Sequence, residues 1–517
     1  MSFARSLFTV SGLTAVSRVG GYIRDTLTAA FLGAGAEADA FFVAQRLPNL
    51  FRSLFAEGAF SAAFVPLYTS EQEKHGPEAA QIFAGQALMA LLAALIPFSI
   101  IVMMFMPQAM FLLAPGFESD PGKFNLAATF STITFPYLAL ISITALQTGV
   151  LNARGRFGPG AAAPIALNIV LILGLIAAHY FKWDVGYALA WSLTISGAVQ
   201  CAWLAISCWR ARASIPLLRP HLGEASRKLF RRIGPGALGA GAAQINLAIS
   251  TNFASHLPGA VSYLFYADRL NQLPLGIVGV ATATTLLPLL SRYIATGDHA
   301  KARHFTGRAI EFSLLLGLPA MIGLATMSRP IVQILFQHGA FTHDDTVQTV
   351  HALRAYAFGI PGFLLVKVFA AGFFARHDTK TPVKIALIAL ATNVICAYFL
   401  RIPFQHTGIA LANSIATTLN AALLYLMMRR HGIPAGNPDL GWRIAKILFC
   451  ALLMTAASMC TTNYVWNHFS LDNIPQESLY LSGLIAFATL VYGTALHAVG
   501  AMRWRDALAI LRKKPVE

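Results

Sequence analysis

Seven basic side chains lie within long apolar stretches of this 517-residue chain. They are Arg18, Arg24, Arg46, Arg52, Arg269, Arg354 and Lys367. A charge at the centre of a membrane helix costs roughly 2.5 to 3.5 kcal/mol, so seven charges facing lipid would together cost on the order of 20 kcal/mol. We therefore expect these side chains to face a cavity.

Only three acidic residues, Asp25, Glu57 and Asp268, share these stretches. Three carboxylates cannot neutralise seven cations, so the predicted cavity stays positive and favours an anionic ligand. Six of the seven cations are arginines, whose planar guanidinium binds phosphate or carboxylate through two parallel hydrogen bonds. We predict that four of them contact the substrate: Arg18, Arg24, Arg52 and Arg269.

The other charges have structural interpretations. Asp25 lies seven residues after Arg18, and Asp39 lies seven residues before Arg46. Four acidic residues are therefore expected to orient arginines and to support the cavity: Asp25, Asp39, Glu57 and Asp268. The remaining cations fit substrate contact and snorkelling toward an interface equally well: Arg46, Arg354 and Lys367.

Helix breakers accompany the first arginines. Gly20 and Gly21 separate Arg18 from Arg24, and Pro48 lies between the next two arginines. A kink or an unwound turn at the glycines would direct both guanidinium groups toward one ligand, and the proline also permits bending. Broken helices commonly mark the binding site of a transporter.

The composition determines the class of protein that holds these charges. Hydrophobic residues make up 56% of the chain, charged residues only 12%, and the mean hydropathy is +0.61, whereas soluble domains carry about 25% charged residues. This excludes an ordinary soluble enzyme. The apolar runs predict an all-α polytopic membrane protein with about fourteen transmembrane helices; among them are 39–70, 81–113, 383–400 and 407–428.

The distribution of Lys and Arg predicts the topology. With the amino terminus in the cytoplasm, 27 basic residues fall in cytoplasmic loops and tails, and four fall outside: Lys123, Lys182, Arg329 and Arg401. The positive-inside rule then places both termini in the cytoplasm. The net charge of +16 divides into +17 inside, −5 outside and +4 within the membrane, and the inner excess is a topology signal that gives no reason to expect nucleic-acid binding.

An internal repeat organises the helices. GYALAWS at Gly186 recurs as GIALANS at Gly408, and the sequence around Arg154 recurs around Arg376 at the same spacing. FVAQRLPNL, ending at Leu50, recurs at nearly this spacing as FYADRLNQL. Parallel repeats predict two six-helix lobes around a central cationic cavity, as in transporters. The predicted parts are lobes at 1–215 and 222–430, two added helices within 441–500, and a basic cytoplasmic tail at 501–517.

The sequence gives little support for metal binding, ATP hydrolysis or other catalysis. The five cysteines form no CxxC pair, and three histidines, His338, His343 and His351, lack metal-ligand spacing, so no metal is predicted. GFESDPGKF at Gly116 departs from the phosphate-binding loop, and no ATP-dependent or other enzymatic activity is expected. A drug antiporter would need intramembrane carboxylates, and a membrane glycosyltransferase would need acidic catalytic loops.

The segment SRVGGYIRDTLTAAFLGAGAEADAFFVAQRLPNLFRSLFAEGAFSAAFVPLY, from Ser17 to Tyr68, closely resembles the start of the MurJ (MviN) family of lipid II flippases. The resemblance extends through PLGIVGVATATTLLPLLSR to the two added helices. It implies the multidrug/oligosaccharidyl-lipid/polysaccharide exporter fold, with a V-shaped cavity whose essential arginines correspond to Arg18, Arg24, Arg52 and Arg269. It also implies that the added helices form a groove for a lipid tail.

The resemblance further implies the substrate. Lipid II, the undecaprenyl-diphosphate-linked peptidoglycan precursor, would move from the inner to the outer leaflet of the bacterial inner membrane by alternating access, with its diphosphate on the arginines. A transporter of another polyprenyl-diphosphate-linked oligosaccharide is the alternative. Membrane lipids and the peptidoglycan synthesis machinery are the other expected partners, no cofactor is expected, and membrane potential or an ion would drive transport.

Overall fold

The computed structural model describes residues 3–55, 59–218, 244–432, 439–468 and 474–501. Within these ranges every regular element is helical, which confirms the all-α prediction. Nine of the described helices are long and apolar enough to cross a membrane. The chain divides into two compact units: residues 1–262 with 338–342, and residues 263–337 with 343–517.

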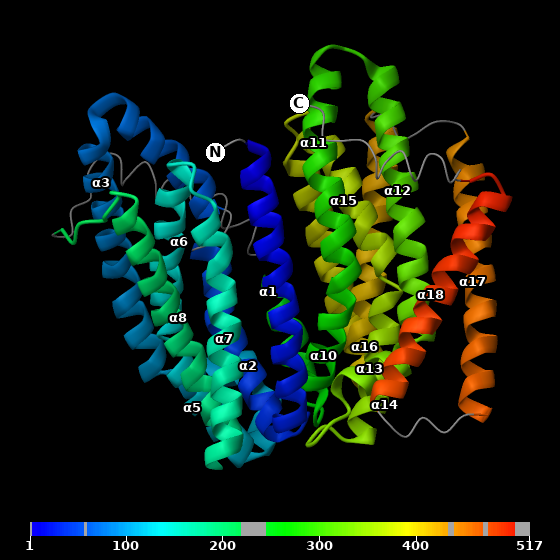
Figure 1. The fold of residues 1–517 in the computed structure, drawn as a ribbon, viewed down its shortest axis with the longest axis horizontal. Helices are drawn as coiled ribbons and strands as arrows, with labels where there is room; N and C mark the ends of the chain where they lie inside the picture. The colour runs from blue at the N-terminus through cyan, green and yellow to red at the C-terminus, as the bar shows by residue number, and fades with distance from the viewer. Residues whose placement is uncertain (1–2, 56–58, 219–243, 433–438, 469–473, 502–517) are drawn as a thin grey trace. The chain divides into compact units, whose positions relative to one another are not determined.

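The first unit contains α1 to α8, drawn from blue to green-cyan in Figure 1. Their bounds are α1 Phe3–Leu32, α2 Ala36–Phe55, α3 Ala59–Met104, α4 Met106–Leu113, the 3-10 helix η1 Pro115–Ser119, α5 Pro121–Thr134, α6 Tyr137–Ala153, α7 Gly158–Phe181 and α8 Val185–Arg210. Residues 244–255 are also helical. α7 packs against both α1 and α8, and an apolar core forms around buried aromatic rings such as Phe64 and Tyr68.

The second unit contains the remaining helices, of which α10 begins in the first unit. Their bounds are α10 Ala260–Pro274, the π-helical turn η2 Leu275–Gly279, α11 Val280–Ala295, α12 His299–Thr326, α13 Ser328–Phe336, α14 His343–Ala357, α15 Ile360–Phe374, α16 Lys380–Arg430, α17 Leu440–His468 and α18 Ile474–Ala498. α17 and α18 pack against each other (Figure 1), and α12 packs on α15 and α17.

Two long helices each contain a reversal. A straight helix of the 51 residues of α16 would be about 76 Å long, more than twice the hydrocarbon thickness of a membrane. Gln405 has non-helical dihedral angles, with φ 50° and ψ −133°, at the break predicted between 400 and 407. In α3 the break is at Gly76, with φ 87°, between the predicted spans 39–70 and 81–113.

The repeat is visible in these elements. Shifting α7 and α8 forward by the spacing between Gly186 and Gly408 places them on the two halves of α16, and nearly the same shift places α2 on α10 and η2.

Parts of the first unit that are distant in sequence also meet. Gly33 has φ +70°, and a Cβ there would lie 2.7 Å from the backbone oxygen of Ala340. The segment 338–342 therefore packs closely on the end of α1, where the Ala340 N–H donates to the Ala30 oxygen over 2.8 Å.

Candidate functional site

Arg24 is held in place by a hydrogen-bond network between α1 and α7. Its Nε and Nη2 donate to Asp25 Oδ1 over 2.9 and 2.6 Å, and its Nη1 donates to Asn168 Oδ1 over 3.0 Å. Both members of the ion pair are buried. Asn168 in turn donates from Nδ2 to the Ser17 backbone oxygen over 2.8 Å, so one amide of α7 fixes both the guanidinium and the helix that carries it.

The two glycines of α1 do not break the helix. α1 continues without interruption from Phe3 to Leu32, so the predicted unwound turn is wrong for this structure, and the predicted kink stays a prediction. A Cβ on Gly20 would lie 3.4 Å from Asn168 Nδ2. A Cβ at either glycine would make only ordinary van der Waals contact with Asn168, so the packing of α7 and the bond from Arg24 to Asn168 do not require glycine at these positions.

Arg18 differs from Arg24 in its surroundings. Its side chain is exposed, and among the described residues no carboxylate forms an ion pair with it, because the carboxylate predicted for it, Asp25, bonds to Arg24. α1 therefore carries one guanidinium fixed by partners and one that is accessible. The accessible side chain can direct its N–H donors toward a ligand.

Asp39 accepts four hydrogen bonds. It is fully buried and accepts hydrogen bonds from Lys123 Nζ over 2.6 Å, from the Gly259 N–H over 3.0 Å, and from the Ser262 N–H and hydroxyl over 2.8 and 2.7 Å. Gly259 and Ser262 flank the start of α10, where free N–H groups attract negative charge. Asp39 thus stabilises a helix start and a buried ammonium group, in place of the expected interaction with Arg46.

Lys123 lies in a helix, so the predicted loop at this position is wrong, while its predicted location on the outer side stays a prediction. The residue lies in the first turn of α5, is 7% exposed, and places its ammonium 4.2 Å from the centroid of the Phe117 ring. Asp120 caps α5 by accepting from the Lys123 N–H over 3.1 Å. The sequence does carry a signal for this helix start, since Asp followed by Pro is typical of an N-cap and first helical position.

Glu37 also bonds away from the arginines. Its Oε1 accepts from the Gly186 N–H over 2.6 Å at the start of α8. Glu37 precedes the predicted span at Asp39, and burial together with the nearby Asp184 carboxylate raises its pKa to about 7. Two of the three carboxylates between Arg18 and Arg52, those of Glu37 and Asp39, are therefore engaged elsewhere.

Arg46 and Arg52 lie half-buried on α2. Arg46 Nη1 donates to Thr251 Oγ1 over 2.6 Å, and Arg52 Nε donates to Asn49 Oδ1 over 3.0 Å. Pro48 lies inside α2, which is helical from Ala36 to Phe55. Glu57 lies outside the described residues.

In the second unit, Arg269 and Asp268 are neighbours on α10 and are both half-buried. The Arg269 guanidinium lies 4.7 Å from the centroid of the Phe265 ring, one helical turn earlier, and this cation–π contact supports the guanidinium through its face. Asp268 accepts a hydrogen bond from Gln272. The predicted pairing of Asp268 with Arg269 stays a prediction.

Two further cations of this unit have local partners. Arg354 Nε donates to Ser328 Oγ over 2.9 Å and to the Ala325 oxygen over 3.2 Å, which satisfies a carbonyl at the end of α12 as basic residues near helix C-termini do. The Lys367 ammonium lies 5.2 Å from the centroid of the Phe363 ring. Among the described residues, no group of His, Cys, Asp or Glu is arranged to hold a metal ion.

A large apolar cavity lies entirely within the second unit. It has a volume of about 740 Å³ and is lined by α12, α15, α16 and the start of α17. Apolar side chains such as Leu314, Leu365 and Phe369 form most of the wall, and Arg429 lies among its lining residues. A cavity of this composition fits a hydrocarbon chain with a polar group near Arg429.

Comparisons with known proteins were consistent across sequence and structure. The family model described as lipid II flippase MurJ matches residues 28–480. A probable lipid II flippase MurJ of Rhizobium meliloti (strain 1021) is 42% identical over 97% of this chain and 94% of its own length, and a lipid II flippase MurJ of Burkholderia cenocepacia is 35% identical over 95% and 97%.

Solved structures give the same result. One described as lipid II flippase MurJ in an inward closed conformation superimposes with a TM-score of 0.80, at 26% identity, over 96% of this chain and 99% of that chain. An inward-facing multidrug resistance MATE transporter of the MOP superfamily has a TM-score of 0.65 at 15% identity, over 81% of this chain and 94% of its own, which shows the fold alone. The chain is a multi-pass membrane protein that belongs to the lipid II flippase MurJ family.

Proposed function

We propose that this protein moves lipid II from the inner to the outer leaflet of the bacterial inner membrane. The observation that carries the proposal is the charge of α1 and α2. Four arginines lie between positions 18 and 52, while two of the three carboxylates between these positions bond to Lys123 and to the α8 start. The four guanidinium groups outnumber the carboxylate that remains, Asp25, and a diphosphate suits the excess positive charge.

The two arginines of α1 have different roles in this proposal. Arg24, bonded to Asp25 and Asn168, is preorganised, so little conformational entropy is lost when a phosphate binds to it. Arg18 is exposed and closes on the same diphosphate. Arg52 supplies further guanidinium donors in the first unit, and in the second unit Phe265 supports the guanidinium plane of Arg269.

Transport requires that the substrate prefer one conformation over another. A ligand shifts a conformational equilibrium only by its differential affinity for the two states, and a dianionic diphosphate among several arginines supplies that difference by neutralising repulsion between them. The chain holds no ATP-binding motif. We propose that membrane potential, acting on these charges, resets the empty protein.

The polyprenyl tail is assigned to the apolar cavity of the second unit. The cavity is bounded by α17, which lies outside the repeat, and by three helices within it. Leaving the tail in apolar surroundings while the headgroup crosses avoids the cost of about 0.8 kcal/mol for each CH₂ group exposed to water. The polar headgroup then needs only the arginine-lined route.

The membrane orientation is also proposed from charge. Arg154 Nη1 donates to the backbone oxygens of Ala211 and Arg212 over 3.1 and 3.0 Å, so the basic loops at 154–156 and 210–212 gather at one end of the first unit. Under the positive-inside rule this end faces the cytoplasm, with both termini.

The decisive experiment follows the lipid. Proteoliposomes containing the full-length chain and lipid II in the inner leaflet should expose the headgroup to an external hydrolase, and the Arg18→Ala variant should reduce the rate at least tenfold, while the loop variant Lys182→Ala should not change it. Transport of a different undecaprenyl-diphosphate-linked glycan in preference to lipid II would contradict the proposed substrate.

A further inference from the structure

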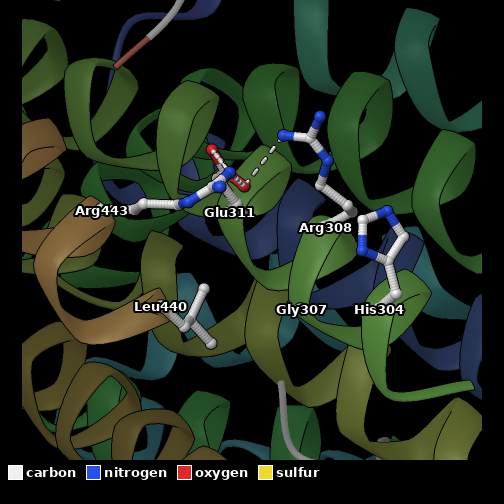
Figure 2. Close-up of a pocket in the computed structure, with 6 residues that line it drawn as sticks. All are labelled: His304, Gly307, Arg308, Glu311, Leu440 and Arg443. Atoms are coloured by element: carbon white, nitrogen blue, oxygen red, sulfur yellow. Dashed lines mark hydrogen bonds and ion pairs between the residues drawn. The ribbon is translucent and has the colours of Figure 1, made fainter. Parts of the chain in front are cut away.

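A small polar pocket lies between α12 and α17 (Figure 2). It has a volume of about 70 Å³, and its lining comprises His304, Gly307, Arg308, Glu311, Leu440 and Arg443. In Figure 2 the Glu311 carboxylate lies between Arg308, three residues earlier on α12, and Arg443 of α17. All six residues belong to the second unit.

Two arginines share one carboxylate in this pocket. Arg308 Nη1 and Arg443 Nη1 lie 3.2 and 3.3 Å from Glu311 Oε2, and the Glu311 side chain is 12% exposed while those of Arg308 and Arg443 are 59% and 46% exposed. One arginine would neutralise the glutamate. The second leaves a surplus positive charge, and each guanidinium, with five N–H donors, uses only Nη1 toward Glu311.

The surroundings of this charge have the composition of a membrane–water interface. Trp442, next to Arg443, is 69% exposed, and its ring lies 5.8 Å from the Lys446 ammonium; exposed tryptophan flanked by cations is typical of the membrane–water interface. Beyond the pocket, both helices continue with exposed large apolar side chains, Phe312 on α12 and Leu448 on α17. A lipid anchored by its headgroup would find apolar surface along its chains.

We propose that the pocket of Arg308, Glu311 and Arg443 binds the phosphodiester headgroup of an anionic membrane phospholipid. Basic pockets between transmembrane helices bind such headgroups, and two guanidinium groups with spare donors match the phosphate oxygens. Gly307 and His304 are the other lining residues of α12. The bound lipid links α12 to α17 and so stabilises an element outside the repeat, independently of which substrate is transported.

The test uses the full-length protein in neutral detergent and a photo-crosslinkable phosphatidylglycerol. Removing one arginine leaves a neutral Arg–Glu pair, so Arg443→Gln and Arg308→Gln should each weaken binding about five- to tenfold, as expected for one cation near a lipid headgroup. Arg303→Gln, which removes an exposed cation of the same helix that does not line the pocket, should weaken binding less than twofold.

Competition identifies the ligand. Unlabelled phosphatidylglycerol should displace the probe, and neither phosphatidylcholine nor inorganic phosphate should do so. Crosslinks on the wild-type protein should map to α12 and α17, a readout that does not depend on the folding of a variant. Crosslinks elsewhere, displacement by inorganic phosphate, or equal losses in Arg303→Gln and Arg443→Gln would each overturn the proposal.

Discussion

Asp39 accepts two hydrogen bonds from Ser262, one from its backbone N–H over 2.8 Å and one from its hydroxyl over 2.7 Å. The sequence separation of Asp39 and Ser262 is the same as that of Arg46 and Arg269 in the repeat. The two residues therefore occupy equivalent positions in the two copies and bond to each other. A carboxylate in one copy and a hydroxyl in the other make this contact complementary.

Breaking the buried Asp39–Lys123 pair should strongly destabilise the protein. Lys123→Met leaves a buried carboxylate without its cation, and losing one member of such a pair costs about 3 to 5 kcal/mol. The double variant Asp39→Asn with Lys123→Met should recover much of this loss. Thermal unfolding in detergent measures both effects, with Lys182→Met, an exposed cation, as the control.

If the double variant were as unstable as the sum of both single variants, the pair would not act as a unit. If it recovered stability but failed to support growth of a flippase-depleted strain, Asp39 would have a role in transport beyond stabilising α10 and α5.

Substitutions at Arg18 and at Asn168, the partner of Arg24, should affect lipid II binding and protein stability separately. Arg18 is exposed, so Arg18→Ala should change the free energy of unfolding by no more than about 0.5 kcal/mol while reducing lipid II binding at least tenfold. Asn168→Ala removes a hydrogen bond to the charged Arg24 and should cost about 1.5 to 3 kcal/mol. Lipid II binding and thermal unfolding, measured on the same preparations, check both expectations; full binding by Arg18→Ala would remove that residue from the site.

Glu37 should make stability depend on pH. Its pKa is raised from 4.5 to about 7, so between these pH values the folded state binds more protons than the unfolded state. The free energy of unfolding should therefore fall as the pH rises from about 4.5 to 7 and change little above that through this group. Glu37→Gln should remove this component of the Tm profile, whereas the exposed Glu118→Gln should keep it; an unchanged profile in Glu37→Gln argues against the raised pKa.

Cysteine labelling tests the proposed orientation. In a cysteine-free background, Lys182→Cys in the loop before α8 and Ala300→Cys at the start of α12 are both exposed. A membrane-impermeant maleimide added to intact cells with a permeabilised outer membrane should label position 182 and not position 300. Labelling of both positions, or of position 300 alone, would refute the proposed topology.

Much of the fold could be predicted from the sequence because membrane helices are specified locally. Apolar length and the repeat led to an all-α architecture and to the break near Gln405, since a 51-residue helix cannot remain straight within one bilayer. The pairing of charged side chains was harder to predict from the sequence. Spacing along one helix favoured Arg18 with Asp25 and Arg46 with Asp39, whereas Asp25 bonds to the adjacent Arg24.

The partners that sequence reasoning missed come from other helices. Lys123 and Asn168 lie 84 and 144 residues from Asp39 and Arg24, and nothing in local spacing links them. The glycines of α1 are predicted to unwind the helix, whereas α1 is helical throughout, and a Cβ at either position would make only ordinary contact with Asn168. Such distant contacts depend on which faces of helices meet, and periodicity alone leaves that open.

The glycine that begins each copy of the GxALAxS motif has different neighbours in the two copies. A Cβ on Gly186 would lie 2.5 Å from both Glu37 Oε1 and a Phe130 ring carbon, whereas a Cβ on Gly408 would lie 2.2 Å from the Leu400 backbone oxygen across the Gln405 reversal. The same residue type is thus required in both copies by unrelated neighbours. A side chain at position 186 could be admitted only by moving the side chains of Glu37 and Phe130, whereas one at position 408 would have to displace the backbone that forms the reversal.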